Sequence, residues 1–99
     1  MKILAMDRLR PGVTVETVTP FLKEEAAHAW ELHLSGVFRE IYFRGDRPGA
    51  VIILECKDAA QARTVLSSLP LVRENLIEFD VIPLEAFKPF GLLFAEEKK

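Results

Sequence analysis

Four short stretches of this chain have the composition of β-strands. They cover residues 2–8, 37–44, 50–56 and 77–84, and they are rich in β-branched, aromatic and other apolar residues. The stretch at 50–56 is apolar without interruption apart from its acidic position, which is typical of a central strand covered on both faces. Turn residues separate the strands, among them the glycine- and proline-containing loop 45–49, which predicts a hairpin between the second and third strands.

The segment between the first two strands carries helical signals. Thr19-Pro20 predicts the helix start, since threonine can cap free N–H groups and proline fits the first helical position. Ser35-Gly36 predicts its end, because glycine tolerates the left-handed conformation that follows many helices. A helical spacing then places on one face, toward the sheet, the residues Val18, Leu22, Ala26, Ala29 and His33.

A second helix is predicted between the third and fourth strands. Asp58 followed by Gln61 has nearly the spacing of a capping box, and the helix should end near Ser68, before Pro70. Leu69-Pro70-Leu71 and the polar residues after it then predict a turn into the last strand. The order is therefore strand, helix, strand, strand, helix, strand, which is the ferredoxin-like βαββαβ order of an α+β fold: a four-stranded antiparallel sheet with two helices on one face.

Residues 86–99 follow the last strand as an apolar tail. Proline and glycine within it make a regular helix unfavourable, so we expect an extended segment that packs on a neighbouring subunit. The large side chains concerned are Phe87, Phe90, Leu92, Leu93 and Phe94. Residues 1–99 have the length of a single domain. A lone sheet would leave one apolar face in water, and the chain is therefore expected to be a homodimer or a higher homo-oligomer.

Composition narrows the classes of partner. The net charge of −2 and the pI near 5.7 lack the basic excess of a nucleic-acid-binding protein. No apolar run is long enough for a membrane span, and the first residues resemble a strand rather than a signal peptide, so a cytoplasmic location is expected. Cys56 is the one cysteine, and no metal-ligand spacing is present, so neither a disulfide nor a metal site is expected.

Much of the chain, up to about residue 90, resembles the muconolactone isomerase family. The similar positions lie at the first helix and its end, in the second strand, and around the last strand. They are Leu22-Lys23-Glu24-Glu25, Gly36, Phe38-Arg39, Tyr42, Leu69-Pro70-Leu71 and the strand from Ile77 to Pro83. The resemblance implies a dimeric α/β barrel, in which two sheets join, and proton transfer on an unsaturated lactone without metal or organic cofactor.

Three function classes follow from this resemblance. The first is cofactor-free acid/base isomerisation of a small lactone or carbonyl compound. The second is a binding or accessory protein for a small apolar ligand; it is favoured by the loop Gly45 to Gly49, which lacks the histidine that the family carries there. The third is a cofactor-free monooxygenase on the same fold. Fold alone does not choose among them.

Candidate catalytic residues are His28, His33 and Glu25. The two histidines have side chains whose ordinary pKa suits proton transfer near neutral pH. Glu25, one turn earlier, could orient either ring or act as the base. The alternatives are a hydrogen-bonded core histidine for His33, simple exposure for His28, and a partner of the helix dipole for Glu25.

Candidate substrate-binding residues are Arg39, Tyr42 and Trp30. Arg39 could hold a carboxylate of an anionic ligand, or it could form a salt bridge with Asp7, Glu55 or Glu78. The hydroxyl of Tyr42 could donate to a carbonyl or enolate, or the ring could pack at a subunit interface. Trp30 is expected to be a core residue more than a platform for a ligand.

Overall fold

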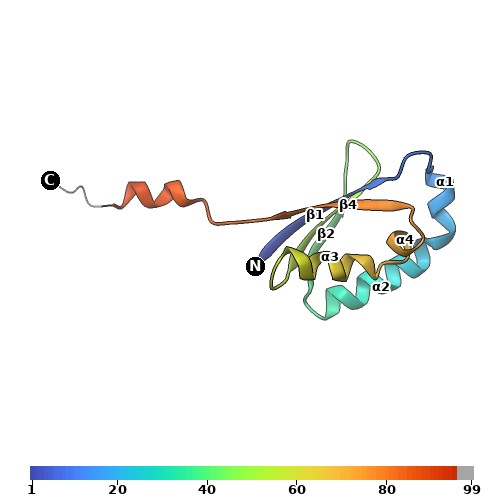
Figure 1. The fold of residues 1–99 in the computed structure, drawn as a ribbon, viewed down its shortest axis with the longest axis horizontal. Coiled ribbons are helices and arrows are strands. Elements are labelled where there is room, and N and C mark those ends of the chain that lie inside the picture. The colour runs from blue at the N-terminus through green and yellow to red at the C-terminus, as the bar shows by residue number, and fades with distance from the viewer. Residues whose placement is uncertain (96–99) are drawn as a thin grey trace.

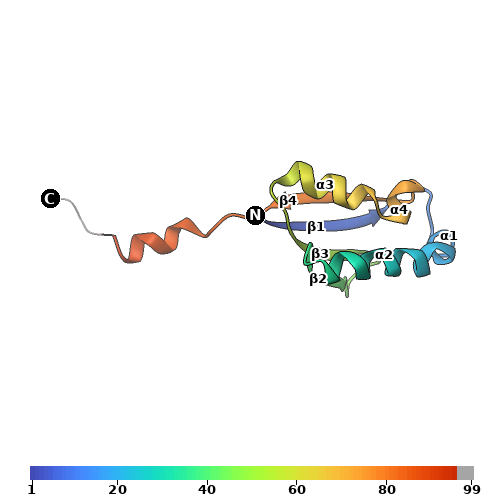
Figure 2. The ribbon, with the colours of Figure 1, turned by 90° about the horizontal axis from the view of Figure 1, so that it is seen from below.

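The computed structural model describes residues 1–95 and forms one antiparallel sheet of four strands. The strands are β1 (Lys2–Leu9), β2 (Phe38–Phe43), β3 (Ala50–Glu55) and β4 (Ile77–Pro83), in the spatial order β2-β3-β1-β4. Figure 1 and Figure 2 show the longer helices on one face of this sheet only. The expected ferredoxin-like α+β fold is confirmed, and β1 and β3 are its central strands.

The helical segment after β1 consists of three consecutive pieces. They are α1 (Val15–Val18), the 3₁₀ turn η1 (Thr19–Phe21) and α2 (Leu22–Leu34). The prediction that Thr19 caps the helix was wrong, because Thr19 already has helical backbone angles and its hydroxyl donates to the carbonyl of Val15 at 2.8 Å. The predicted end was correct: α2 stops before Ser35, and Gly36 follows with a positive φ of 85°.

The second helix, α3 (Ala59–Ser67), begins as the sequence predicts. The side chain of Asp58 accepts a hydrogen bond from the backbone N–H of Gln61 at 2.8 Å, and the Gln61 side chain accepts one from the N–H of Lys57. The segment after α3 differs from the predicted turn. Pro70 stands at the first position of a further short helix, α4 (Pro70–Arg73), and the apolar residues around it are buried.

The core lies between the helices and the sheet. Alternate residues of the two central strands point toward the helices and are fully buried, for example Ile3 and Ala5 of β1 and Ile52 and Leu54 of β3. A smaller cluster of Val18, Leu71 and Ile77 closes the end of the sheet near α1. Because strand residues alternate between faces, the neighbours of these core residues lie on the face that no helix covers.

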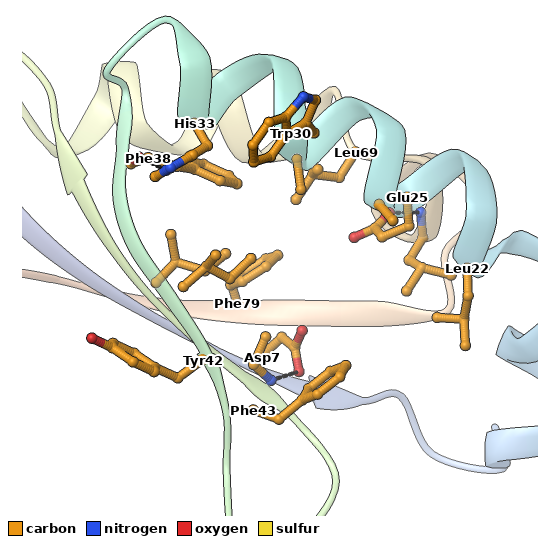
Figure 3. A pocket seen from close by; sticks show the side chains of 16 residues that line it. Asp7, Leu22, Glu25, Trp30, His33, Phe38, Tyr42, Phe43, Leu69 and Phe79 are labelled. Atoms are coloured by element: carbon orange, nitrogen blue, oxygen red, sulfur yellow. Dashed lines mark hydrogen bonds between the residues drawn. The ribbon is translucent and has the colours of Figure 1, made fainter.

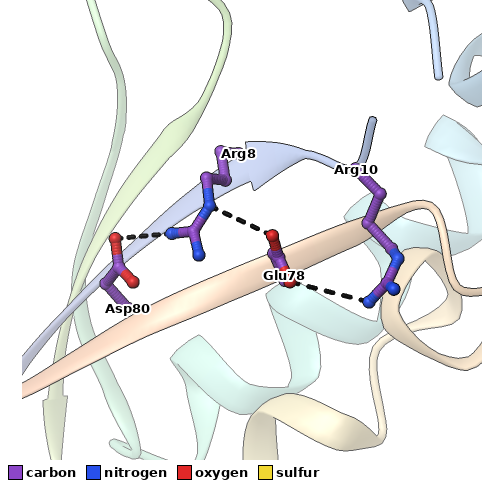
Figure 4. Close-up of polar contacts among 4 residues, drawn as sticks. All are labelled: Arg8, Arg10, Glu78 and Asp80. Carbon is purple, nitrogen blue, oxygen red and sulfur yellow. Dashed lines mark hydrogen bonds and ion pairs between the residues drawn. The ribbon is translucent and has the colours of Figure 1, made fainter. Parts of the chain in front are cut away.

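The uncovered face combines an apolar centre with charged side chains along β1 and β4. Arg8 pairs with Glu78 and with Asp80, at 3.1 and 2.6 Å, and Arg10 lies 3.6 Å from Glu78 (Figure 4). These side chains are more than a third exposed, and such pairs add little stability in water. They keep one side of this face polar, whereas half-buried aliphatic residues such as Leu4 and Ile53 occupy its middle.

The apolar tail leaves the fold after β4 (Figure 1). The prediction of an extended segment was wrong, since residues Lys88–Leu93 form the 3₁₀ helix η2 and Phe87 packs edge-on against Phe90. Proline occurs at the start of η2, where it loses no hydrogen bond. The tail gives the molecule a length of 65 Å and a radius of gyration of 17.0 Å, against about 13 Å for a compact chain of this size.

Candidate active site

A cavity of about 630 Å³ lies between α2 and the sheet, mostly against β2 and β3. Its origin is in the sequence of α2, where the positions that face the sheet include the small residues Ala26 and Ala29. No residue of α2 is fully buried, whereas α3 fills its side of the sheet with Ala62 and Leu66. The helix therefore stands over a space that its own side chains do not fill.

Glu25 extends from α2 into this cavity (Figure 3). Its Oε1 accepts a hydrogen bond from the backbone N–H of Leu71 at 3.0 Å, which fixes the carboxyl group and leaves Oε2 available. Burial raises the pKa of Glu25 above its ordinary value of 4.5. The Leu71 N–H lowers it, Asp7 raises it, and His28 and Arg73 lower it by smaller amounts. A carboxylate with a raised pKa in an apolar space is a stronger base than one in water.

Asp7 lies on the opposite wall of the cavity, near the C-terminal end of β1. Its Oδ1 accepts a hydrogen bond from the backbone N–H of Ala50 at 2.9 Å. Burial raises the pKa of Asp7 and the Ala50 N–H lowers it by less. Figure 3 shows the second oxygen of Asp7 directed into the cavity, toward the wall that carries Glu25. The cavity thus holds two half-buried carboxyl groups that come from different elements.

Gly49 allows the hairpin loop to approach Asp7. Its φ is +150°, and a Cβ at this position would lie 2.8 Å from the backbone oxygen of Asp7 and 3.2 Å from its Oδ1. Only glycine avoids both the strained backbone and this clash. Gly49 therefore allows the loop to come close enough for the Ala50 N–H to donate to the carboxyl group of Asp7.

Gly49→Ala is expected to lower the free energy of unfolding by about 1–3 kcal/mol, the usual cost of forcing extra atoms into a packed site. The change should appear in urea denaturation and in an altered amide shift of Ala50. Gly45→Ala, in the same loop, is the matched control, because nothing lies within 4 Å of its added Cβ. Equal stability of the two variants would show that the close approach of Gly49 to Asp7 does not contribute to the free energy of unfolding.

Asp7→Asn is expected to raise the melting temperature at pH 7. The raised pKa means that the folded state binds the proton more tightly, so the ionised group destabilises the fold above its folded pKa. This cost disappears as the pH falls toward the ordinary value of 3.8, and the gain of the variant should shrink with it. Asparagine keeps an oxygen for the Ala50 N–H.

Asp46→Asn is the control for the melting temperature of Asp7→Asn, because the pKa of Asp46 is lowered and that of Asp7 is raised. Arg44 holds the pKa of Asp46 at about 2, so the neutral replacement should bring no gain at pH 7. A lower melting temperature for Asp7→Asn than for the unchanged protein would contradict the expected effect of burial.

His33 and Trp30 lie along the rim of the cavity. The Nδ1–H of His33 donates to the carbonyl of Phe38 at 3.1 Å, since a carbonyl can only accept, and this leaves Nε2 for another partner. The indole of Trp30 lies 5.5 Å from the imidazole, centroid to centroid, and is 60% exposed. The expectation that Trp30 is a core residue is therefore wrong, because α2 is lifted from the sheet at this point.

His28 lies outside the cavity, half-buried between α2 and α3. Its Nε2 is 2.7 Å from the hydroxyl oxygen of Ser68. That hydroxyl donates its own hydrogen to the carbonyl of Val65 at 2.6 Å, so the imidazole is the donor to Ser68. A serine in this arrangement is not activated as a nucleophile, and the pair instead connects the two helices.

Arg39 and Tyr42 lie beside a β-bulge between Phe38 and Glu40, which shifts the register of β2 from Glu40 onward. Arg39 stands in the bulge, is exposed, and does not line the cavity; it forms no ion pair with any of residues 1–95. Tyr42 reaches the edge of the cavity, but its hydroxyl donates to Glu40 at 2.8 Å, and Figure 3 shows it pointing away from both carboxyl groups. This hydrogen bond raises the pKa of Tyr42.

The remaining walls are apolar and come from α2, β2, β3, β4 and the residues around α4. Those lining residues include Leu22, Phe38, Ile41, Phe43, Ile52, Leu69 and Phe79. Within residues 1–95 there is no group of three or more histidine, cysteine, aspartate or glutamate side chains that could hold a metal ion. No helix in the same range has the length and hydropathy needed to cross a membrane. The arrangement can bind a small ring and move a proton on it through a carboxyl group.

Comparison with known proteins identifies a family and similar solved structures. A family model for muconolactone delta-isomerase matches residues 4–89. Among solved structures, the chain is similar to a 5-chloro-2-hydroxyhydroquinone dehydrochlorinase from Burkholderia phenoliruptrix AC1100, determined in complex with 2,5-dihydroxybenzoquinone. The TM-score is 0.64 at 18% identity, over 89% of this chain and 97% of that one. A comparison with curated proteins found no match.

Proposed function

Because this chain belongs to the muconolactone delta-isomerase family, we propose that it relocates a proton on a small cyclic carbonyl compound, with Glu25 as the base. The observation that carries the proposal is the position of Glu25: a half-buried carboxyl group held by the Leu71 N–H in a largely apolar cavity. The similar dehydrochlorinase was determined with a quinone, which is also a ring bearing carbonyl oxygens.

The chemistry proposed uses the two walls of the cavity. Oε2 of Glu25 removes a proton from the carbon between the carbonyl and the C=C bond. The same group returns a proton to the far carbon of the resulting dienolate, so that the double bond moves next to the carbonyl. Asp7, when protonated, donates a hydrogen bond to the ligand oxygen as negative charge develops there. The Nε2 of His33 lies at the rim, where it can exchange protons with solvent. The apolar walls keep bulk water from the enolate.

The test is the conversion of α-angelica lactone to β-angelica lactone, a neutral unsaturated lactone whose isomers differ in the position of one proton. We would follow the reaction by proton NMR in deuterated buffer. The protein is expected to accelerate the conversion over buffer alone and to incorporate deuterium at the reacting carbon. If the lactone binds in the cavity but the protein does not accelerate its conversion, the chain is a binding protein and not an isomerase. Consumption of oxygen would indicate the monooxygenase.

We propose further that the active form is a homo-oligomer in the cytoplasm. The support is the exposed apolar tail and the half-buried aliphatic centre of the uncovered sheet face. A second sheet packed on this face would complete a barrel of two sheets, as the sequence resemblance implies. The charged residues of β1 and β4 would then lie at the border of the contact, where they favour one orientation of the two copies.

A further inference from the structure

The charges that line the cavity are unusual for a site expected to take an anionic ligand. Among the lining residues the groups that can be negative are Asp7 and Glu25, whereas His33 is the one that can be positive and no lysine or arginine is included. Arg39, the arginine expected to hold a carboxylate, is outside the cavity. A ligand carboxylate would therefore meet like charge with no compensating arginine.

The two carboxyl groups are also prepared to accept hydrogen bonds. Each uses one oxygen for a backbone N–H, from Ala50 in the case of Asp7 and from Leu71 in the case of Glu25. The other oxygens face the cavity from opposite walls (Figure 3). Asp7 raises the pKa of Glu25, so the two carboxyl groups act on each other across the cavity. Together they present acceptor oxygens on both sides.

From this geometry we propose that the cavity selects an uncharged ring that carries a hydroxyl group and rejects the same ring with a carboxylate. The hydroxyl donates to Asp7 or Glu25, and the apolar walls cover the ring. The inference rests on the proposed function in that it names the ligand class of the same site, but it concerns binding and not turnover. It departs from the anionic ligand that the exposed Arg39 suggested.

The groups that shift the pKa of these carboxyls come from β1, α2, β3 and α4. For Glu25 they are Asp7 on β1, His28 on its own helix, and Arg73 on α4. For Asp7 the neighbour is the Ala50 N–H on β3. Arg73 reduces the negative field at Glu25 without lining the cavity, so it does not provide a direct partner for a ligand carboxylate.

The test compares hydroquinone with 4-hydroxybenzoate, two phenols that differ by a hydroxyl and a carboxylate. Titration of the full chain at pH 7 would be followed through the backbone amide shifts of Ala50 and Leu71, since these N–H groups contact the two carboxyl groups. Hydroquinone is expected to shift both amides and to bind at least tenfold more tightly than 4-hydroxybenzoate. The double variant Asp7→Asn, Glu25→Gln should lose that preference.

The matched control is the double variant Asp46→Asn, Glu24→Gln, which removes two exposed carboxyl groups and should keep the preference. Equal binding of the two phenols to the unchanged protein, no shift with hydroquinone at millimolar concentration, or an unchanged preference in the Asp7, Glu25 variant would each overturn the inference. Lactone isomerisation is measured in a separate experiment. If the protein isomerises the lactone but does not prefer hydroquinone, only this inference fails. If it prefers hydroquinone but does not isomerise the lactone, only the proposed reaction fails.

Discussion

Glu25→Gln is expected to lower the rate of lactone isomerisation by about 10²–10⁴-fold, the range that a positioned general base contributes. The amide keeps the size of the side chain and an oxygen for the Leu71 N–H, so the cavity should retain its shape. The loss should fall on kcat, because the base acts in the transition state more than in ligand binding. Steady-state rates with α-angelica lactone at pH 7 measure it.

The neighbouring variant Glu24→Gln is the control, because this side chain is exposed on the same helix and lies outside the cavity. Its rate should equal that of the unchanged protein. In the unchanged protein the rate should rise with pH through the raised pKa of Glu25, above 4.5, because the ionised form is the base. A Glu25→Gln variant with full activity, or with the same pH profile, would assign the proton transfer to another group.

Deletion of residues 86–99 is expected to reduce the assembly to a smaller species and to lower its stability. Five large apolar side chains of the tail are between 64% and 85% exposed in the single chain. Burying each against a partner contributes about 1.5–3 kcal/mol before the cost of ordering. For a domain of this size each 1 kcal/mol corresponds to about 4–8 °C in melting temperature. Light scattering and thermal unfolding measure the two effects.

Deletion of residues 96–99 alone is the control for the tail, since it keeps all five apolar side chains. This shorter deletion should leave the mass of the assembly unchanged. The intact chain should scatter as more than its 11.2 kDa monomer at micromolar concentration. An oligomer of the same size and stability after removal of residues 86–99 would show that the tail takes no part in assembly.

The fold could be predicted from local signals that tertiary packing did not overrule. The apolar runs became strands within one or two residues of their expected bounds, and Gly36 and Asp58 ended and began helices as their chemistry requires. The errors lie where two local signals compete. Thr19-Pro20 has the composition of a helix start, but the chain is already helical from Val15, and Leu69-Pro70 begins a helix because proline also suits a first turn.

The site was less predictable, because it depends on which face each strand residue occupies. Asp7 was overlooked as a site residue, although the alternation Ile3, Ala5, Asp7 places it on the helix side of β1. Its position beside the cavity, near the end of β1 and under a helix with small residues, explains why a charged side chain is accepted there. Arg39 follows the buried Phe38, so alternation alone places it on the other face of β2. The bulge after Phe38 gives no sequence signal, and it shifts Tyr42 out of the alternation that begins at Phe38.

The position of Trp30 makes the protein its own optical probe. It is the one tryptophan of the chain, it borders the cavity, and its indole is near the imidazole of His33. Its emission therefore reports the polarity of the space under α2, and it should change when a ring enters the cavity and displaces water. Intrinsic fluorescence can follow ligand entry in this chain without a label and without knowledge of the reaction.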